Sequence, residues 1–148
     1  MRNKKYFLAI LVLLLLSLLF LTQRKRTSTI TVGKKTLQVE VAKTEAEKEK
    51  GLSGRASLCP NCGMLFLLDQ PAIYPFWMRK MYFDIDIIWI NGNRVADITY
   101  GAQKPSKEEF EAPKIIYQSQ VLVDKVLEVN AGWATGNDIK VGDEVKIQ

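Results

Sequence analysis

Apolar residues form one unbroken run near the start of the chain and short alternating segments after it. The run covers residues 6–22 and contains no charged residue, glycine or proline. As a helix, its 17 residues would span about 25 Å, near the lower limit for crossing a bilayer. It also lacks the polar face that a buried core helix would show. The run ends in FLTQRKR (20–26), where a cleaved signal peptide needs small residues. We therefore predict an uncleaved signal anchor over residues 1–26, with a cleaved signal as the alternative.

The segment after the anchor switches from a strand pattern to a helix pattern. Residues 27–41 predict two strands joined by a turn at Gly33 and Lys34. Residues 43–50 predict a short helix, because Thr44 and Glu47 have the spacing of a capping box and Gly51 is a C-terminal stop. We interpret the charges of this helix as a solvated face rather than a site.

The stretch from residue 63 to 91 is the most apolar part of the chain outside the N-terminus, and the remaining elements are arranged around it. We predict a break at residues 69–71, a hairpin turn at 91–93, an exposed loop at 101–113 and a single helical turn at 133–135. Strands are expected at 63–68, 76–78, 83–90, 94–99, 115–117, 121–130 and 144–147. Residues 27–148 are therefore expected to form one mainly β domain, a compact sandwich or closed barrel with one short helix, behind an N-terminal transmembrane helix.

The charge distribution changes what the net charge of +5 implies. Six of the 21 Lys and Arg residues flank the apolar run, so residues 27–148 hold 15 basic against 16 acidic residues. This balance argues against nucleic acid as a partner of the domain. The chain has no histidine, which removes the commonest general base and the commonest zinc ligand. We expect no cofactor.

Several ordered motifs resemble the DUF192 family, a prokaryotic domain of unknown function. They are GLSGR (51–55), GMLF (63–66), FWMR (76–79), DII (86–88), Tyr117 with Ser119, LEVNAG (127–132) and GDEV (142–145). The resemblance covers residues 35–147 and implies a compact, mostly β fold without a known reaction. The chain departs from the family pattern at Ser53, Lys80, Met81 and Asp84, and the cysteine pair lies outside it.

Cys59 and Cys62 have the spacing of a tight disulfide, half of a zinc site or a redox motif. Two cysteines and no histidine cannot supply the four ligands of structural zinc, and a thioredoxin-like pair would need a helix directly after it. We predict a disulfide, and metal or redox roles stay open. A Cu(I) site using Met64, Met78 and Met81 is a narrower alternative.

Carboxylates inside predicted strands are the strongest candidates for a site, since a buried charge needs a partner. Asp84 and Asp86 would share one strand face, and Glu128 lies in an otherwise apolar strand. We predict that Arg79 pairs with Asp86 or Glu128. The alternatives are a structural network of Arg and carboxylate groups, or a pocket ringed by Trp77, Met78, Trp89 and Tyr117. The candidate ligand-binding residues are Arg55, Trp77, Arg79, Asp86, Tyr117, Glu128 and Asn130.

The leading functional hypothesis is a membrane-anchored binding or accessory module. Its N-terminal segment would lie in the cell membrane through residues 6–22. The numbers of basic residues on the two sides of this segment are nearly equal, so they do not determine its orientation in the membrane. We predict an extracytoplasmic domain because a disulfide between the two cysteines would form in an oxidising compartment. An enzyme using Asp86 and Glu128 as acid and base is one alternative. A metal or redox carrier built on Cys59 and Cys62 is the other.

Overall fold

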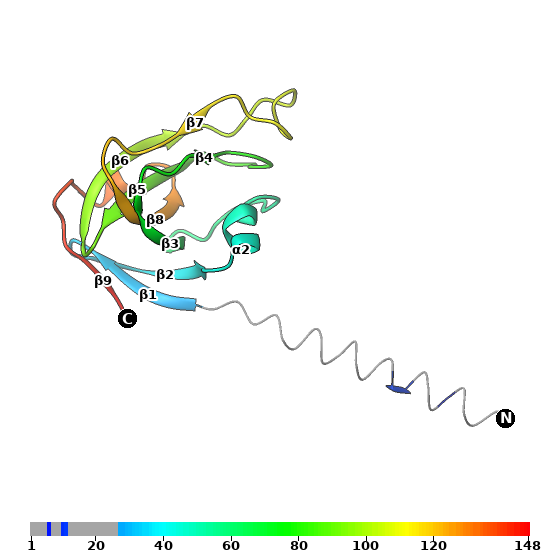
Figure 1. The fold of residues 1–148 in the computed structure, drawn as a ribbon, viewed down its shortest axis with the longest axis horizontal. Helices are drawn as coiled ribbons and strands as arrows, with labels where there is room; N and C mark the ends of the chain where they lie inside the picture. Colours follow the sequence, from blue (N-terminus) through cyan, green and yellow to red (C-terminus); the bar gives the residue numbers. More distant parts are fainter. Residues whose placement is uncertain (1–5, 7–9, 12–26) are drawn as a thin grey trace.

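The computed structural model describes residues 6, 10–11 and 27–148 (Figure 1). Its strands and helices in chain order are β1 (Thr27–Val32), β2 (Lys35–Ala42), α2 (Glu45–Lys50), β3 (Cys62–Ala72), β4 (Phe76–Trp77), β5 (Ile85–Asn91), β6 (Arg94–Ala102), β7 (Ile116–Tyr117), β8 (Val123–Asn130), α3 (Trp133–Gly136) and β9 (Val145–Ile147). The predicted mainly β class is confirmed.

Seven strands form one mixed sheet in the order β6-β5-β8-β3-β2-β1-β9, and β4 pairs with β7 in a separate short ribbon. All neighbours in the sheet are antiparallel except β2 and β3, which run parallel because the chain crosses over through α2. The sheet curls until its two edge strands approach at one end (Figure 1). There the amide of Val145 donates to the carbonyl of Asn93 at 2.8 Å, and Arg94 forms a bridge with Glu144. The architecture is thus a half-barrel, neither the sandwich nor the fully closed barrel that we expected.

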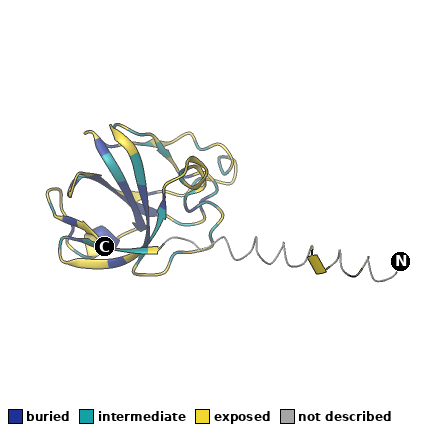
Figure 2. Cartoon of the chain, turned by 60° about the horizontal axis from the view of Figure 1, so that its bottom comes forward, coloured by how far each residue is buried: buried dark blue, intermediate teal, exposed yellow. Residues whose placement is uncertain are grey.

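The two faces of the curled sheet bury two separate apolar clusters. Figure 2 shows that buried residues are concentrated in the strands of this sheet. Alternation along each strand sends neighbouring side chains to opposite faces. The first cluster contains Leu65, Ile88 and Leu127, and α3 packs against it. The second contains Phe66, Trp89 and Val126, together with side chains from the loops around β4. This second face carries the candidate site.

The helix before β3 is built as its sequence predicts. Thr44 accepts from the amide of Glu47 at 3.3 Å, and the Glu47 carboxylate accepts from the amide of Thr44 at 2.9 Å, which completes the capping box. Gly51 ends the helix with a φ of 46°. Glycine adopts such a positive φ readily because it has no Cβ, whereas other residues would be strained. The helical turn expected after residue 132 is also present, as α3.

The predicted end of the central strand at residues 69–71 is wrong, because β3 continues to Ala72. Its pairing with β8 runs regularly to Leu67 opposite Lys125 and resumes at Ala72 opposite Val123. The extra residues between these two pairs form an irregularity, and Pro71 lies within it. A proline is tolerated there because it has no ladder hydrogen bond to donate.

The predicted anchor, residues 6–22, lies outside the described residues except for Tyr6, Ile10 and Leu11. Within the part of the chain that the structure describes, no helix has the length and apolar character needed to span a membrane.

Candidate functional site

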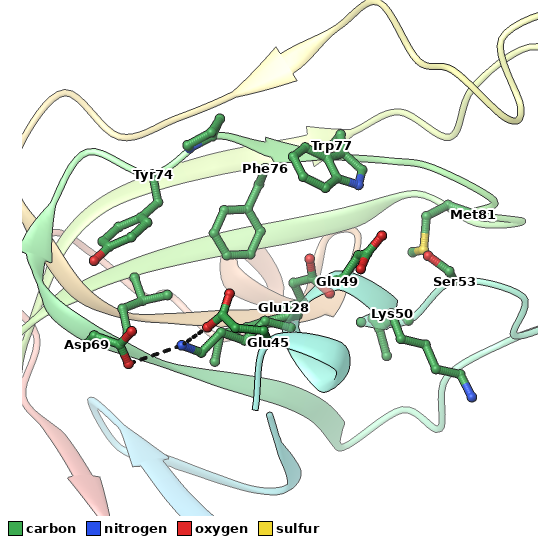
Figure 3. Close-up of a pocket in the computed structure, with 16 residues that line it drawn as sticks. Glu45, Glu49, Lys50, Ser53, Asp69, Tyr74, Phe76, Trp77, Met81 and Glu128 are labelled. Carbon is green, nitrogen blue, oxygen red and sulfur yellow. Dashed lines mark hydrogen bonds and ion pairs between the residues drawn. The ribbon is translucent and has the colours of Figure 1, made fainter. Parts of the chain in front are cut away.

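A cavity of about 470 Å³ lies between α2, the far half of β3 and the segment around β4 (Figure 3). This is the size range of sites for small organic molecules. Its walls are formed by Glu45, Lys48, Glu49, Lys50, Gly51, Leu52, Ser53, Phe66, Leu68, Asp69, Tyr74, Pro75, Phe76, Trp77, Met81 and Glu128.

One wall of the cavity is aromatic. Phe76 packs edge-on against Phe66 of β3 and against Trp89 of β5, with ring centroids 5.2 and 5.4 Å apart. Such perpendicular pairs fix the ring of Phe76 in place. Trp77, the next residue of β4, lines the cavity while 43% exposed. This wall therefore combines a rigid ring with an accessible one.

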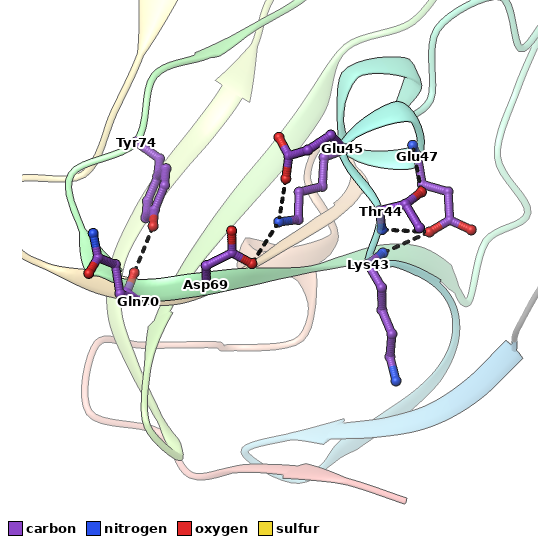
Figure 4. Close-up of polar contacts among 8 residues, drawn as sticks. Lys43, Thr44, Glu45, Glu47, Asp69, Gln70 and Tyr74 are labelled. Atoms are coloured by element: carbon purple, nitrogen blue, oxygen red, sulfur yellow. Dashed lines mark hydrogen bonds and ion pairs between the residues drawn. The ribbon is translucent and has the colours of Figure 1, made fainter.

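The opposite wall is α2, which is tied to β3 by the ion pairs of Lys48 with Glu45 and Asp69, two acidic residues labelled in Figure 4. The ammonium group lies 2.9 Å from Glu45 and 3.3 Å from Asp69, and the Lys48 side chain is only 14% exposed. The hydrogen bond to Glu45 raises the pKa of Lys48, so this group stays charged. Our interpretation of the helix charges as a purely solvated face is therefore wrong for Lys48. The spacing of Glu45, Lys48 and Glu49, which places them on one helix face, was the available signal.

The end of the cavity near Ser53 is held by two hydrogen bonds between loops. The Ser53 hydroxyl donates to the carbonyl of Arg79 at 2.8 Å, and the amide of Gly54 donates to the carbonyl of Lys80 at 2.9 Å. These bonds join the segment after α2 to the segment after β4, and Met81 lines the cavity beside them.

Glu128 of β8 is the polar group in the floor of the cavity. It is 6% exposed, and its carboxyl group makes no hydrogen bond or ion pair within the described residues. Its oxygens open into the cavity (Figure 3). Burial raises the pKa of Glu128 to about 8, and the nearby positive charge of Arg55 opposes this rise. At neutral pH the floor of the cavity therefore carries a mostly protonated carboxyl group.

Arg55 reaches this region from the loop between α2 and β3. Its guanidinium forms two parallel bonds, of 2.6 and 2.8 Å, with the carboxylate of Glu40. Register places Glu40, Met64 and Glu128 in one row across β2, β3 and β8. Arg55 thus acts on Glu128 through its electric field, while its hydrogen bonds go to Glu40.

Asp86 lies on the other face of the sheet. In the pairing of β5 with β8, Asp86 is opposite Val129, and Glu128 is opposite Ile87. Asp86 is 1% exposed and accepts from the amides of Gly101 and Ala134, both at 2.9 Å. It therefore caps the first turn of α3. The hypothesis of an acid and base pair formed by Asp86 and Glu128 is wrong, because the sheet separates them.

Arg79 does not pair with either buried carboxylate, so that prediction is also wrong. Its guanidinium is 4.0 Å from Glu49 and 3.7 Å from Glu111, and its side chain is 44% exposed. Residues 78–81 form a turn, in which Lys80 has a φ of 56°, rather than the continued strand that would place Arg79 beside Trp77. Asp84 precedes β5, and its carboxylate accepts from the amide of Lys104 at 2.8 Å.

The other predicted site residues lie apart from the cavity. Tyr117 of β7 accepts from the amide of Gln103 at 3.0 Å and, with Met78, lines a second pocket of about 220 Å³. Asn130 of β8 donates to the carbonyls of Leu58 and Cys59, and so holds the loop before β3. The structure therefore brings Trp77 and Glu128 together in one cavity and distributes the remaining candidates around it.

Cys59 and Cys62 form the predicted disulfide. Met64, Met78 and Met81 are buried in the second apolar cluster, where they pack against other apolar side chains. The residues described hold no group of three or more His, Cys, Asp or Glu side chains placed to bind a metal ion.

The fold and the site define a curled half-barrel β domain with a small-molecule-sized cavity beside its sheet. Comparison with known proteins gives the family. The chain belongs to DUF192, a family of uncharacterized ACR proteins, whose model matches residues 27–147.

Two crystal structures resemble this one over most of their length. A protein of unknown function from Novosphingobium aromaticivorans is 31% identical, with a TM-score of 0.72; the match covers 81% of this chain and 84% of the other. A "putative transcription regulator" from Sinorhizobium meliloti is 26% identical, with a TM-score of 0.74, and the match covers 83% and 95%. No curated protein matches the chain.

Proposed function

We propose that this protein is a membrane-anchored, extracytoplasmic module that binds a small organic molecule in the cavity between α2 and β4. The observation that carries the binding proposal is the cavity itself, about 470 Å³ in volume, with one aromatic wall and, in its floor, a buried carboxyl group that has no hydrogen-bond partner among the described residues. Apolar walls with a few convergent polar groups are typical of ligand sites. A group like Glu128 is costly to bury unless a partner completes its interactions.

The location rests on different observations. Residues 6–22 are long and apolar enough to anchor the chain, and no cleavage site follows them. The disulfide between Cys59 and Cys62 favours an oxidising compartment, which supports an extracytoplasmic domain. The near balance of basic and acidic residues over 27–148 does not favour a nucleic-acid partner.

Binding is tested with the full-length protein in lipid nanodiscs. Saturation-transfer NMR with 2-phenylethanol and other small aromatic compounds should show transfer to the ligand, after subtraction of empty nanodiscs. Leu68→Trp, which fills the cavity, should abolish the transfer, while Leu122→Trp, at an exposed position away from it, should not. Transfer that persists in Leu68→Trp, or no transfer with any compound, would reject the proposal.

Location is tested separately. Full-length protein should stay in the membrane pellet after carbonate extraction. Protease added to spheroplasts should remove the domain. Protection of the domain under these conditions would place it on the cytoplasmic side instead.

A further inference from the structure

The carboxyl group of Glu128 distinguishes this cavity from a purely apolar pocket. It is 6% exposed, opens into the cavity and has no hydrogen-bond or ion-pair partner among the described residues. The usual partners of such a group are a donor from the protein, a bound water or a ligand. Here the space beside the carboxyl group is large enough for a ligand.

The remaining charges of the cavity wall favour a positively charged ligand. Besides Glu128, the cavity wall contains three acidic residues and two basic ones. The acidic residues are Glu45, Glu49 and Asp69, and the basic residues are Lys48 and Lys50. Lys48 is already bonded to Glu45 and Asp69. The positive charge of Lys48 is thus neutralised by these two carboxylates. Because acidic residues outnumber basic ones in the wall, a bound anion would be repelled.

The aromatic wall favours the same kind of ligand. Phe76 is fixed by its edge-on contacts with Phe66 and Trp89, and Trp77 presents an accessible ring at the cavity. Aromatic faces attract ammonium groups, and tryptophan does so best. The same rings also cover the apolar part of an organic amine.

We propose that the cavity binds an organic ammonium cation, with Glu128 as its buried counter-ion and Phe76 and Trp77 against its apolar body. This inference rests on the proposed function and adds the class of ligand. Binding of the cation leaves the net charge of the site unchanged, because the carboxyl group of Glu128 releases one proton to solvent as the cation binds.

The charged and titratable groups around Glu128 come from every element packed at the site. They are Glu45, Lys48, Glu49 and Lys50 of α2, Asp69 of β3, Tyr74 after β3, Arg55 before β3, and Glu40 of β2. Arg55 favours the ionised form of Glu128, and its bidentate bond to Glu40 offsets its repulsion of an incoming cation. Burial opposes ionisation until a cation arrives.

Three probes of similar size test the inference on full-length protein in nanodiscs. They are 2-phenylethylammonium, neutral 2-phenylethanol and anionic phenylacetate, with dissociation constants measured by NMR titration from pH 6 to 9. At pH 8 we expect the cation to bind at least tenfold more tightly than the alcohol, and phenylacetate to bind more weakly than both. Affinity for the cation should fall as the pH is lowered from 8 to 6, by up to about tenfold per unit, because Glu128 must lose its proton.

Glu128→Gln keeps the shape of the side chain and removes its charge. It should weaken binding of the cation at least tenfold at pH 8 and remove the pH dependence, while binding of 2-phenylethanol changes less than twofold. Glu108→Gln removes one carboxylate from an exposed loop position and serves as the control for net charge. Thermal melting of each variant confirms that it is folded.

The outcomes separate the two proposals. If the alcohol binds as tightly as the cation, or if Glu128→Gln weakens both probes equally, the cation inference is overturned while the cavity remains a binding site. If none of the probes shows binding that Leu68→Trp abolishes, the proposed function fails and the inference fails with it.

Discussion

Asp86 and Glu128 occupy neighbouring strands but point to opposite faces of the sheet, because Asp86 is in register with Val129 and Glu128 with Ile87. The carboxylate of Asp86 accepts hydrogen bonds from two backbone amides, whereas the carboxyl group of Glu128 has no hydrogen-bond partner among the described residues. One buried carboxylate therefore supports the fold, and the other is available to a ligand. This difference gives the first two predictions.

The stability of the ligand-free protein should fall with rising pH because of Glu128. Its pKa is about 8 in the folded state against an ordinary value of 4.5, so between these values the folded protein holds a proton that the unfolded chain has lost. The contribution of this group is fully present below about pH 4.5, is lost as the pH rises toward 8, and is then constant. The expected slope is about 1.4 kcal/mol per pH unit.

Urea unfolding between pH 5 and 9 measures this slope. Glu128→Gln should flatten the profile and leave the variant more stable than the parent protein at pH 9, whereas Glu108→Gln should keep the slope. A parent profile that is flat or rises between pH 5 and 8 would contradict the burial of an unpaired Glu128.

Asp86→Ala should be among the most damaging substitutions of a polar residue. It would leave the amides of Gly101 and Ala134 without their acceptor in a site that is 1% exposed. We expect a loss of about 2–5 kcal/mol in the free energy of unfolding. Asp84→Ala is the control, since this exposed carboxylate accepts from a single amide and should cost about 1 kcal/mol or less. Equal costs of the two substitutions would argue against this role for Asp86.

Arg55→Ala should destabilise the protein more than Arg79→Ala does. Arg55 is 23% exposed and makes a bidentate bond with Glu40, which is expected to contribute about 1–3 kcal/mol. Arg79 is 44% exposed and lies 3.7 Å or more from its acidic neighbours, so its loss should cost less than about 1 kcal/mol. Chemical denaturation gives the free energy of unfolding of both variants. A larger loss for Arg79→Ala than for Arg55→Ala would show that Arg79 has a role that its contacts do not indicate.

Gly63→Ala should strain the pairing of β3 with β8. A Cβ at this position would lie 2.8 Å from the carbonyl oxygen of Glu128 and 3.0 Å from a methyl carbon of Leu127. We expect a loss of about 3 kcal/mol from this overpacking. Gly136→Ala is the matched control, because no atom outside its chain neighbours and its own helix backbone lies within 4 Å of a Cβ placed there, and it should change stability by less than about 0.5 kcal/mol. Thermal or urea unfolding gives both values, and a neutral Gly63→Ala would mean that β3 can move away from β8.

Replacement of both Cys59 and Cys62 by Ser should cost about 2 kcal/mol, because a disulfide across a sequence separation of 3 restricts the unfolded chain only slightly. Asn130 continues to hold the loop through the carbonyls of Leu58 and Cys59, so the fold should persist. Unfolding of the double variant, compared with the oxidised parent protein in which Cys59 and Cys62 are bonded, measures this cost. Complete loss of folding, or zinc bound in stoichiometric amount, would instead favour a metal site.

Local sequence patterns predict most of the elements of this fold. Alternation predicts the strands, Asn91, Gly92 and Asn93 predict the hairpin between β5 and β6, and Thr44 with Glu47 predicts the cap of α2. These features depend on residues within a few positions of one another, so the sequence alone determines them. The carboxylates in strands also point to buried polar groups, and both Asp86 and Glu128 are buried.

Which of these groups meet in space depends on long-range register and on turns. Period-two alternation separates the faces within a strand, but only the pairing of β5 with β8 shows that Asp86 and Glu128 lie on opposite sides. The turn at residues 78–81 directs Arg79 away from Trp77, and the crossover through α2 places Lys48 against Asp69, 21 positions later in the chain. The cavity exists only where α2, β3 and β4 come together, because no single segment contributes enough walls to enclose it.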